Sequence, residues 1–352
     1  MSNYFSGVGN YVPTQTITNS FFKDYQFLDE MGNLLPQNNA IIAEKLKKNT
    51  GIEERRYANE NQVTSDLGYQ AALMAINDAG IDSETIDYII FAHNFGDIKI
   101  NSIQSDAVPS LASRVKKLLK IKNPYCVAYD VIFGCPGWIE AVIQANTFIN
   151  VGFAKRCLVI GAETLSKIVD KHDRDTMIYA DGAGAVIIEK ALGDKGIYSH
   201  LSSSYTYQEN DYLYFGNSYN KNICQNTKYI KMNGRKIYEF ALNNVPKAMK
   251  KCIDDSKFDI RQISKIIIHQ ANEKMDEAIV NRFYRLFKMQ PPENIMPMII
   301  SKLGNSSVAT IPILLTMLLN NEVENHQIND GDIVLFASVG AGMNINTFIY
   351  RF

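Results

Sequence analysis

The chain has 352 residues, 46% of them hydrophobic, so it can bury a large core, and its length indicates two domains or one domain built from two halves. Lysine and arginine together (36) nearly balance aspartate and glutamate (37), which argues against nucleic acid or an anionic membrane as a partner. The N-terminus carries no basic segment followed by an apolar one, and no apolar run approaches about eighteen residues, so we expect a cytoplasmic protein.

Short apolar runs alternate with longer helical patterns along the chain, which is typical of the α/β class. The predicted strands are 86–94, 125–133, 156–163, 185–190, 265–272, 332–338 and 346–352. The predicted helices, periodic near 3.6 residues, are 65–80, 137–152, 234–253 and 272–287. The Ser-, Asn- and Tyr-rich segment 199–229 shows neither period and predicts a long irregular loop, which is either a solvated connector or a lining of the substrate opening.

The same series of apolar sequence runs occurs twice along the chain. The runs "DYIIFAHN" and "KIIIHQAN" lie roughly 175 positions apart, "CLVIGAE" and "DIVLFAS" are separated by about the same, and "GAGAVIIEK" resembles "GAGMNINTF" at a shorter interval. We interpret this as a duplication, with an N-terminal half over 1–195, a C-terminal half over 196–352, and a mostly parallel sheet in each.

The stretch "VIFGCPGW" predicts a cysteine at the start of a helix. A strand ends at Phe133, Gly134 can adopt a backbone geometry closed to other residues, and Pro136 suits the first helical position. The peptide dipoles and free N–H groups at a helix N-terminus favour negative charge, so we expect a lowered pKa for the Cys135 thiol. The following helix is apolar nearly all round and predicts a buried mount; a merely structural buried cysteine also fits this stretch.

The other four cysteines form no C-x-x-C pair and are widely spaced, which argues against disulfides and a zinc site. We therefore expect no metal.

Polar or small residues also stand next to apolar runs at three other places in the sequence. His269 ends a strand, at the edge where α/β proteins collect their sites, and Asn272 after it is a predicted helix cap. Asn305 precedes a strongly apolar helix, where capping alone also explains it. Gly340, Ala341 and Gly342 follow the last long buried strand, where small residues let backbone N–H groups approach a ligand oxygen. The glycines in "YADGAGAVIIEK" precede a strand and lack the G-x-G-x-x-G spacing, so we reject a dinucleotide site.

In six blocks the chain resembles the β-ketoacyl-acyl-carrier-protein synthase III branch of the thiolase-like condensing enzymes. The blocks are "NTGIEERRYA", "YDVIFGCPGW", the stretch 158–189, "HQAN", "GNSSVATIP" and "GAGMN". The resemblance implies a duplicated, five-layered α-β-α-β-α fold, a homodimer, and a catalytic set of Cys135, His269 and Asn305.

The resemblance also implies the reaction. Cys135 attacks an acyl thioester, and the oxyanion is held by its own backbone N–H and that of Ala341 in the turn from Gly340 to Gly342. A malonyl group on acyl-carrier protein then loses carbon dioxide while His269 and Asn305 donate hydrogen bonds to its thioester oxygen, and the carbanion attacks the acyl group. No metal or organic cofactor is required.

Departures from the family pattern concern the substrate. Asn49 stands near the place where the family has residues that bind coenzyme A, so the primer can arrive on coenzyme A or on acyl-carrier protein. Arg174 matches a family arginine associated with the nucleotide, and Lys274 a basic residue for carrier-protein docking; we also expect Asn272 near the substrate. Val108 aligns with a residue that reaches into the partner's acyl pocket, and its small size favours a longer primer.

Other functions remain open on sequence alone. The same fold supports acyl transfer to oxygen or nitrogen, condensation without decarboxylation, and hydroxymethylglutaryl-type chemistry, although Asn305 favours decarboxylation. Cys135 and His269 could also serve a cysteine hydrolase, in which "GNSS" and "GAGMN" have no required role. A catalytically idle partner subunit is the non-enzymatic alternative, and the complete Cys-His-Asn set argues against it.

Overall fold

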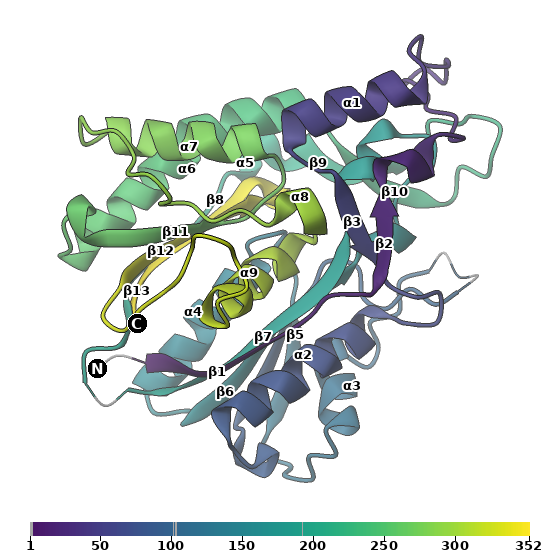
Figure 1. Cartoon of the computed structure of the whole chain (residues 1–352). Helices are drawn as coiled ribbons and strands as arrows, with labels where there is room; N and C mark the ends of the chain where they lie inside the picture. Colours follow the sequence, from purple (N-terminus) through teal and green to yellow (C-terminus); the bar gives the residue numbers. More distant parts are fainter. Residues whose placement is uncertain (1–2, 101, 103, 192) are drawn as a thin grey trace.

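The computed structural model describes residues 3–100, 102, 104–191 and 193–352. It has five layers, in which helices cover both faces of two sheets and a central helical layer separates the sheets (Figure 1). This confirms the α-β-α-β-α architecture predicted from the sequence.

The first sheet has the strand order β1-β7-β6-β4-β5. The strands β4, β5 and β6 are parallel, and β7 is antiparallel to both β6 and β1. Their bounds are β1 (Asn3–Tyr11), β4 (Tyr88–Ala92), β5 (Val127–Val131), β6 (Arg156–Thr164) and β7 (Asp181–Lys190). Since the carboxyl ends of β4, β5 and β6 meet at one edge, residues that follow these strands come together there.

The second sheet has the order β11-β12-β13-β8 and repeats the plan of the first. Its β11 and β12 are parallel, and β13 is antiparallel to β12 and β8. The bounds are β8 (Gly196–Ser204), β11 (Ile263–Ile268), β12 (Ile333–Gly340) and β13 (Asn344–Arg351). The strands β4, β6 and β7 thus correspond to β11, β12 and β13, as the duplicated sequence pattern predicts, and β1 and β8, which it did not predict, take matching places. The expected mostly parallel sheet is wrong for the second half, where, among the described residues, only β11 and β12 pair in parallel. The boundary between residues 195 and 196 stays a prediction.

The central layer consists of α4 (Gly137–Asn150) and α9 (Thr310–Leu319) between the two sheets. In β4, alternate side chains serve different cores: Ile90 packs against the central helices, whereas Ile89 faces the outer ones. This is the period of two expected of a strand covered on both faces. The α4 helix is buried on most sides, as its apolar sequence predicted, so the segment that follows Cys135 is held rigidly.

The outer layers cover the remaining sheet faces. The first sheet is covered by α2 (Thr64–Ala79) and α3 (Leu111–Leu118), and the second by α6 (Gly234–Ser256) and α7 (Glu273–Arg285). The smaller elements are β2 (Gln15–Thr18), β3 (Glu54–Tyr57), α1 (Asn39–Thr50), α5 (Thr206–Glu209) and α8 (Ile300–Leu303).

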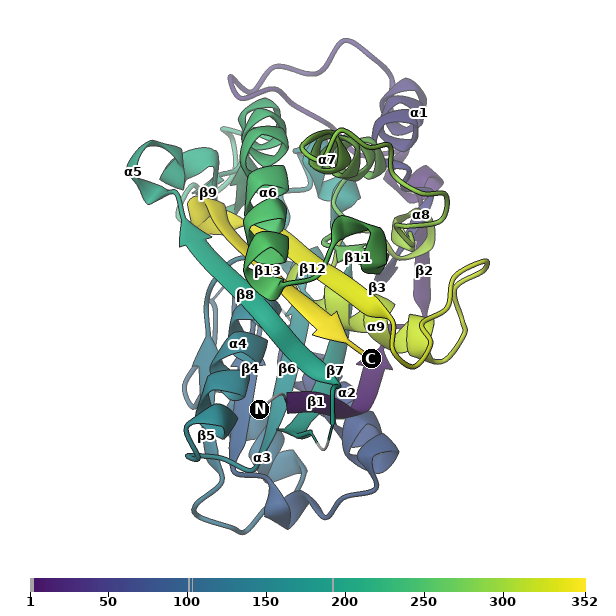
Figure 2. The ribbon, with the colours of Figure 1, turned by 90° about the vertical axis from the view of Figure 1, so that its left-hand side faces the viewer.

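The segment 199–229 differs from the predicted irregular loop. It begins inside β8, which pairs along its length with β13 (Figure 2), and then forms α5 and β9 (Leu213–Asn217), which pairs with β10 (Lys228–Met232). Its pairing partner β13 is distant in sequence, so the local pattern carried no sign of it. Lys231 connects the β9–β10 hairpin to the segment 170–173, because its buried ammonium group contacts the carboxylates of Asp170 (2.7 Å) and Asp173 (2.9 Å).

Candidate active site

The turn between β5 and α4 presents Cys135. Gly134 has a φ of +68°, a left-handed conformation that glycine adopts without a steric penalty. The helix begins at Gly137, where the predicted helix 137–152 also begins, and Pro136 is the capping residue before it rather than the first helical residue; the Pro136 carbonyl accepts a hydrogen bond from the Glu140 N–H (3.0 Å). Cys135 therefore lies just before the N-terminus of a buried helix, with its side chain partly exposed to a cavity.

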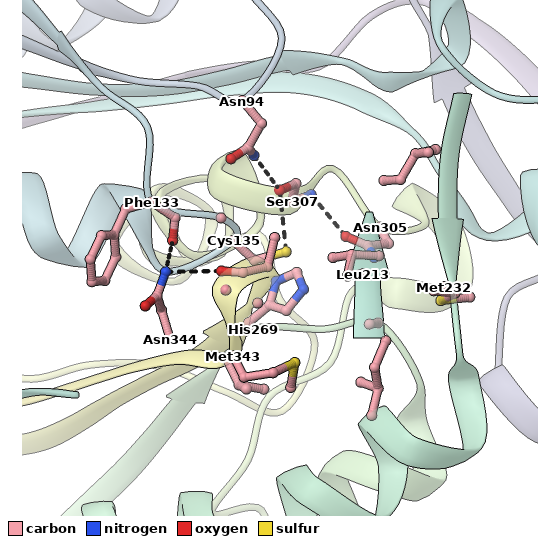
Figure 3. Close-up of a pocket in the computed structure, with 18 of the residues that line it drawn as sticks. Asn94, Phe133, Cys135, Leu213, Met232, His269, Asn305, Ser307, Met343 and Asn344 are labelled. Atoms are coloured by element: carbon pink, nitrogen blue, oxygen red, sulfur yellow. Dashed lines mark hydrogen bonds between the residues drawn. The ribbon is translucent and has the colours of Figure 1, made fainter. Parts of the chain in front are cut away.

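That cavity, of about 410 Å³, brings together Cys135, His269 and Asn305 (Figure 3). His269 follows β11, and its backbone N–H donates to the Ala337 carbonyl (2.9 Å). Asn305 follows α8, and its side-chain oxygen accepts from the Ser307 N–H (2.8 Å). Three side chains distant in sequence thus line one cavity, as the resemblance requires.

Burial sets the charge states of the thiol and the imidazole. It lowers the pKa of His269 to about 4, so the ring is neutral at physiological pH, and its Nδ1 has no hydrogen-bond partner among the described residues. It raises the pKa of the Cys135 thiol to about 11, while the hydroxyl of Ser307 acts in the opposite direction. The lowered thiol pKa expected from the helix N-terminus is therefore wrong, because burial of the thiol is the largest influence on its pKa and raises it. The resting thiol is protonated and must lose its proton to react.

The Cys135 turn packs backbone to backbone against the loop after β12. A Cβ placed on Gly340 would lie 2.4 Å from the Cys135 nitrogen, and one on Gly134 would lie 2.6 Å from the Ala341 nitrogen. The side-chain amide of Asn344 joins the two turns by donating to the carbonyls of Ala341 (2.9 Å) and Phe133 (3.3 Å). The two N–H groups predicted to form the oxyanion hole, those of Cys135 and Ala341, therefore belong to interlocked turns. In the same loop Gly342 has a φ of +75°.

Three polar residues that the sequence did not predict as part of the site form a chain that ends at the sulfur. The Ser307 hydroxyl lies 3.3 Å from the Cys135 sulfur, Asn94 donates to that hydroxyl, and Glu163 accepts from Asn94. Asn94 and Glu163 stand at the ends of the runs "DYIIFAHN" and "CLVIGAE", which were recognised as strands. Polar residues at the carboxyl ends of parallel strands were the available signal.

A second cavity, of about 740 Å³, collects the predicted substrate-binding residues Asn49, Arg174 and Asn272. Asn272 also caps α7 by accepting from the Met275 N–H, as predicted. The lining carries charges of both signs: Lys45, Arg174 and Arg235, and Asp29, Glu30, Asp173 and Asp175. Met232 lines both cavities, so they adjoin one another.

The remaining two predicted residues lie outside both cavities. Lys274 is exposed on the first turn of α7, two residues after the cavity residue Asn272. Val108 is 88% exposed in the segment before α3. The described residues contain no group of three or more His, Cys, Asp or Glu side chains that could hold a metal ion, and none of their helices is long and apolar enough to cross a membrane.

Comparison with known proteins identifies the family. Residues 129–205 match the family model 3-Oxoacyl-[acyl-carrier-protein (ACP)] synthase III, and residues 253–352 match the model of its C-terminal domain. The chain is 32% identical over 339 residues to β-ketoacyl-[acyl-carrier-protein] synthase III of Staphylococcus aureus (strain Newman), covering 96% of this chain and 95% of the relative. The chain belongs to the 3-oxoacyl-[acyl-carrier-protein] synthase III family.

Solved structures agree with this assignment. The synthase III structure from Thermus thermophilus superimposes with a TM-score of 0.82 at 28% identity, covering 99% of both chains. That from Aquifex aeolicus gives a TM-score of 0.81 at 27% identity, covering 99% of this chain and all of the other. The resemblance, the thiolase-like fold and the assignment as an acyltransferase of the condensing type, all predicted from the sequence, are thereby confirmed.

Proposed function

We propose that this synthase III family member joins an acyl thioester primer to malonyl-acyl-carrier protein with loss of carbon dioxide, through an acyl group held on Cys135. The observation that carries the proposal is the placement of Cys135, His269 and Asn305 around one apolar cavity, beside a turn whose backbone N–H groups suit an oxyanion. The product is a β-ketoacyl thioester that is two carbons longer than the primer.

The first half-reaction transfers the primer to the enzyme. The neutral His269 accepts the thiol proton, the Cys135 sulfur attacks the primer carbonyl, and the tetrahedral oxyanion is held by the N–H groups of Cys135 and Ala341. The carbonyl then re-forms, the carbon–sulfur bond to the carrier breaks, and the carrier leaves as a thiol with the proton that His269 had accepted.

The second half-reaction forms the carbon–carbon bond. His269 and the Asn305 amide each donate a hydrogen bond to the thioester oxygen of the malonyl group, which stabilises the enolate charge as carbon dioxide leaves. The carbanion attacks the acyl carbonyl on Cys135, and the sulfur departs as a thiolate and takes up one proton from solvent. A neutral imidazole suits this step because a neutral His269 carries one N–H donor.

The cavity also indicates the kind of primer. Its lining is mostly aliphatic and aromatic, with Phe95, Leu165, Tyr179, Leu213, Phe215, Ile230 and Met232 among the residues. An aliphatic chain gains about 0.8 kcal/mol per methylene buried in such a site. We therefore expect a primer longer than acetyl, in line with the small Val108.

The second cavity is the expected entrance for the thioester carrier. Arg174 and Lys45 suit phosphate groups, and Lys274 on the exposed face of α7 suits an acidic carrier protein. The carboxylates of Asp29 and Glu30 in the same lining repel any phosphate, whichever carrier brings it, so the primer can arrive on coenzyme A or on acyl-carrier protein.

A homodimer in the cytoplasm completes the proposal. The strand β5 lies at the edge of the first sheet, where unpaired backbone groups are available to another strand. Exposed apolar side chains gather in and beside it: Val108, Tyr125, Val127 and Ile132. Ile132 also lines the catalytic cavity, so a partner at this edge would help to close it.

The test is the complete reaction with purified components. A panel of acyl primers, on coenzyme A and on acyl-carrier protein, is incubated with malonyl-acyl-carrier protein, and carbon dioxide and product mass are measured together. The proposal predicts one carbon dioxide per β-ketoacyl product and neither from Cys135→Ala. Product without carbon dioxide, or release of the free acid without condensation, would refute it.

A further inference from the structure

A chain of hydrogen bonds runs from a buried carboxyl group to the sulfur of Cys135. Glu163 Oε1 accepts from the backbone N–H of Asn94 (2.8 Å) and from its side-chain nitrogen (2.6 Å). The same Asn94 nitrogen donates to Ser307 Oγ (3.2 Å), and Ser307 Oγ lies 3.3 Å from Cys135 Sγ (Figure 3).

The fold holds each member of this chain in place. Glu163 lies in β6 and Asn94 follows β4, and these strands are parallel neighbours whose carboxyl ends meet. Ser307 has a φ of +52°, a left-handed conformation uncommon for residues other than glycine. Such strained residues cluster at functional sites, and here the strained backbone directs a hydroxyl group at the sulfur.

The chemistry of the members fixes the direction of the hydrogen bonds. The Asn94 amide nitrogen can only donate, so it directs one hydrogen at Glu163 and the other at the oxygen of Ser307. The Ser307 hydroxyl thus accepts from Asn94, and its single hydrogen remains for the sulfur. We propose that Glu163 and Asn94 are positioning residues that hold Ser307 as a permanent hydrogen-bond donor to Cys135, favouring the thiolate at the moment of attack.

Such a donor compensates for the apolar surroundings of the thiol. A hydrogen bond to the charged form of a group favours ionisation, and burial opposes it. The titratable groups that face this part of the cavity are His269 and Tyr179, and behind Asn94 lies Glu163, which in turn interacts with Asp181. Burial raises the pKa of Glu163 to about 8, so this carboxyl is mostly uncharged at pH 7; where it ionises at higher pH, its charge opposes the thiolate.

The inference rests on the proposed role of Cys135 as the nucleophile. Its test measures the reactivity of the Cys135 thiol directly, without requiring catalytic turnover. Alkylation by iodoacetamide is followed from pH 7 to 9.5 by mass spectrometry of the peptide that contains Cys135, with the exposed Cys224 as an internal reference. At pH values below the midpoint of the thiol ionisation, Ser307→Ala is expected to slow alkylation of Cys135 by about tenfold or more. The reason is that the charged thiolate loses one hydrogen bond. Ser306→Ala is the matched control, because Ser306 is also buried but its hydroxyl faces Thr310 (3.3 Å).

Two further comparisons test the chain beyond Ser307. Asn94→Ala frees the serine hydroxyl to rotate and is expected to slow alkylation in the same direction, which also carries the test if Ser307→Ala fails to fold. Glu163→Ala is expected to do so as well, and Glu163→Gln to restore the rate, because its carbonyl oxygen still accepts from Asn94.

The outcomes separate this inference from the proposed function. The inference would be overturned if Cys135 in Ser307→Ala were alkylated at the wild-type rate, or if Ser306→Ala slowed alkylation as much as Ser307→Ala. Condensation by the wild type would still support the function in either case. Lost turnover in Ser307→Ala with an unchanged alkylation profile would also overturn it, since the serine would then act only through packing. A wild type that alkylates as expected but never condenses would refute the function alone.

Discussion

Replacement of Gly340 by alanine tests whether the oxyanion-hole loop and the nucleophile turn act as one unit. The added Cβ would lie 2.4 Å from the Cys135 nitrogen and 2.8 Å from Pro136 Cδ, where ordinary contact begins at 3.4 Å. The φ of Gly340 is −166°, an extended value open to any residue, so the effect is purely steric. One of the two turns must retreat by about 1 Å, and a displacement of that size at a reacting centre costs about 10²-fold in rate.

The assay combines activity with stability. In Gly340→Ala we expect kcat/KM for condensation to fall about 100-fold, and the free energy of unfolding to fall by about 1–3 kcal/mol from overpacking. The control is Gly234→Ala at the start of α6, where a Cβ meets no atom within 4 Å; its free energy of unfolding should change by less than about 0.5 kcal/mol. A Gly340→Ala enzyme with wild-type kcat/KM would show that the two turns are not coupled, and the oxyanion-hole assignment would fall with it.

Three other variants test the charge states and the cavity. Asn305→Ala should lower carbon dioxide release by about 10²–10³-fold and leave acylation of Cys135 by the primer in place, measured by single-turnover mass spectrometry; equal loss of both steps would contradict its role in decarboxylation. Burial raises the pKa of Glu163 from 4.5 to about 8, so the folded state loses stability relative to the unfolded chain as pH rises through that window. Glu163→Gln removes this titration. The free energy of unfolding of the variant minus that of the wild type, measured by denaturant titration, should therefore grow by a few kcal/mol from pH 4.5 to 8. A pH-independent difference would show that Glu163 is ionised in the folded protein. Leu213→Trp narrows the apolar cavity and should reduce kcat/KM for the longest accepted primer far more than for the shortest, and equal losses would place the primer elsewhere.

The sequence predicted the elements whose signals are local. The apolar runs and the helical periods placed the strands that lead to His269 and Cys135, and the duplicated pattern predicted two matching sheets. The strand β1 was not predicted, because polar residues and the glycines at positions 7 and 9 interrupt its apolar pattern. A Cβ at either glycine would lie within 2.4 Å of a backbone oxygen of α2, so these glycines serve close helix packing that no pattern within β1 reveals.

The site was predictable in its three main members and not in their surroundings. Cys135, His269 and Asn305 were predicted as a set by the resemblance to the family, whereas the link from Glu163 through Asn94 to the sulfur exists only once separate strand ends meet. The thiol pKa was predicted in the wrong direction for a similar reason. The helix N-terminus is visible in the sequence, but the apolar walls that raise the pKa come from distant segments.

The proposed reaction depends on a covalent acyl group on Cys135 that is consumed by a decarboxylating malonyl donor. Rapid-quench peptide mass spectrometry after mixing with an acyl primer, and then with malonyl-acyl-carrier protein, follows that group directly. We expect the primer's acyl mass on the peptide containing Cys135, and its disappearance at the rate at which carbon dioxide and β-ketoacyl product form. An unmodified Cys135 throughout an active turnover, or an acyl group that persists while product accumulates, would contradict it.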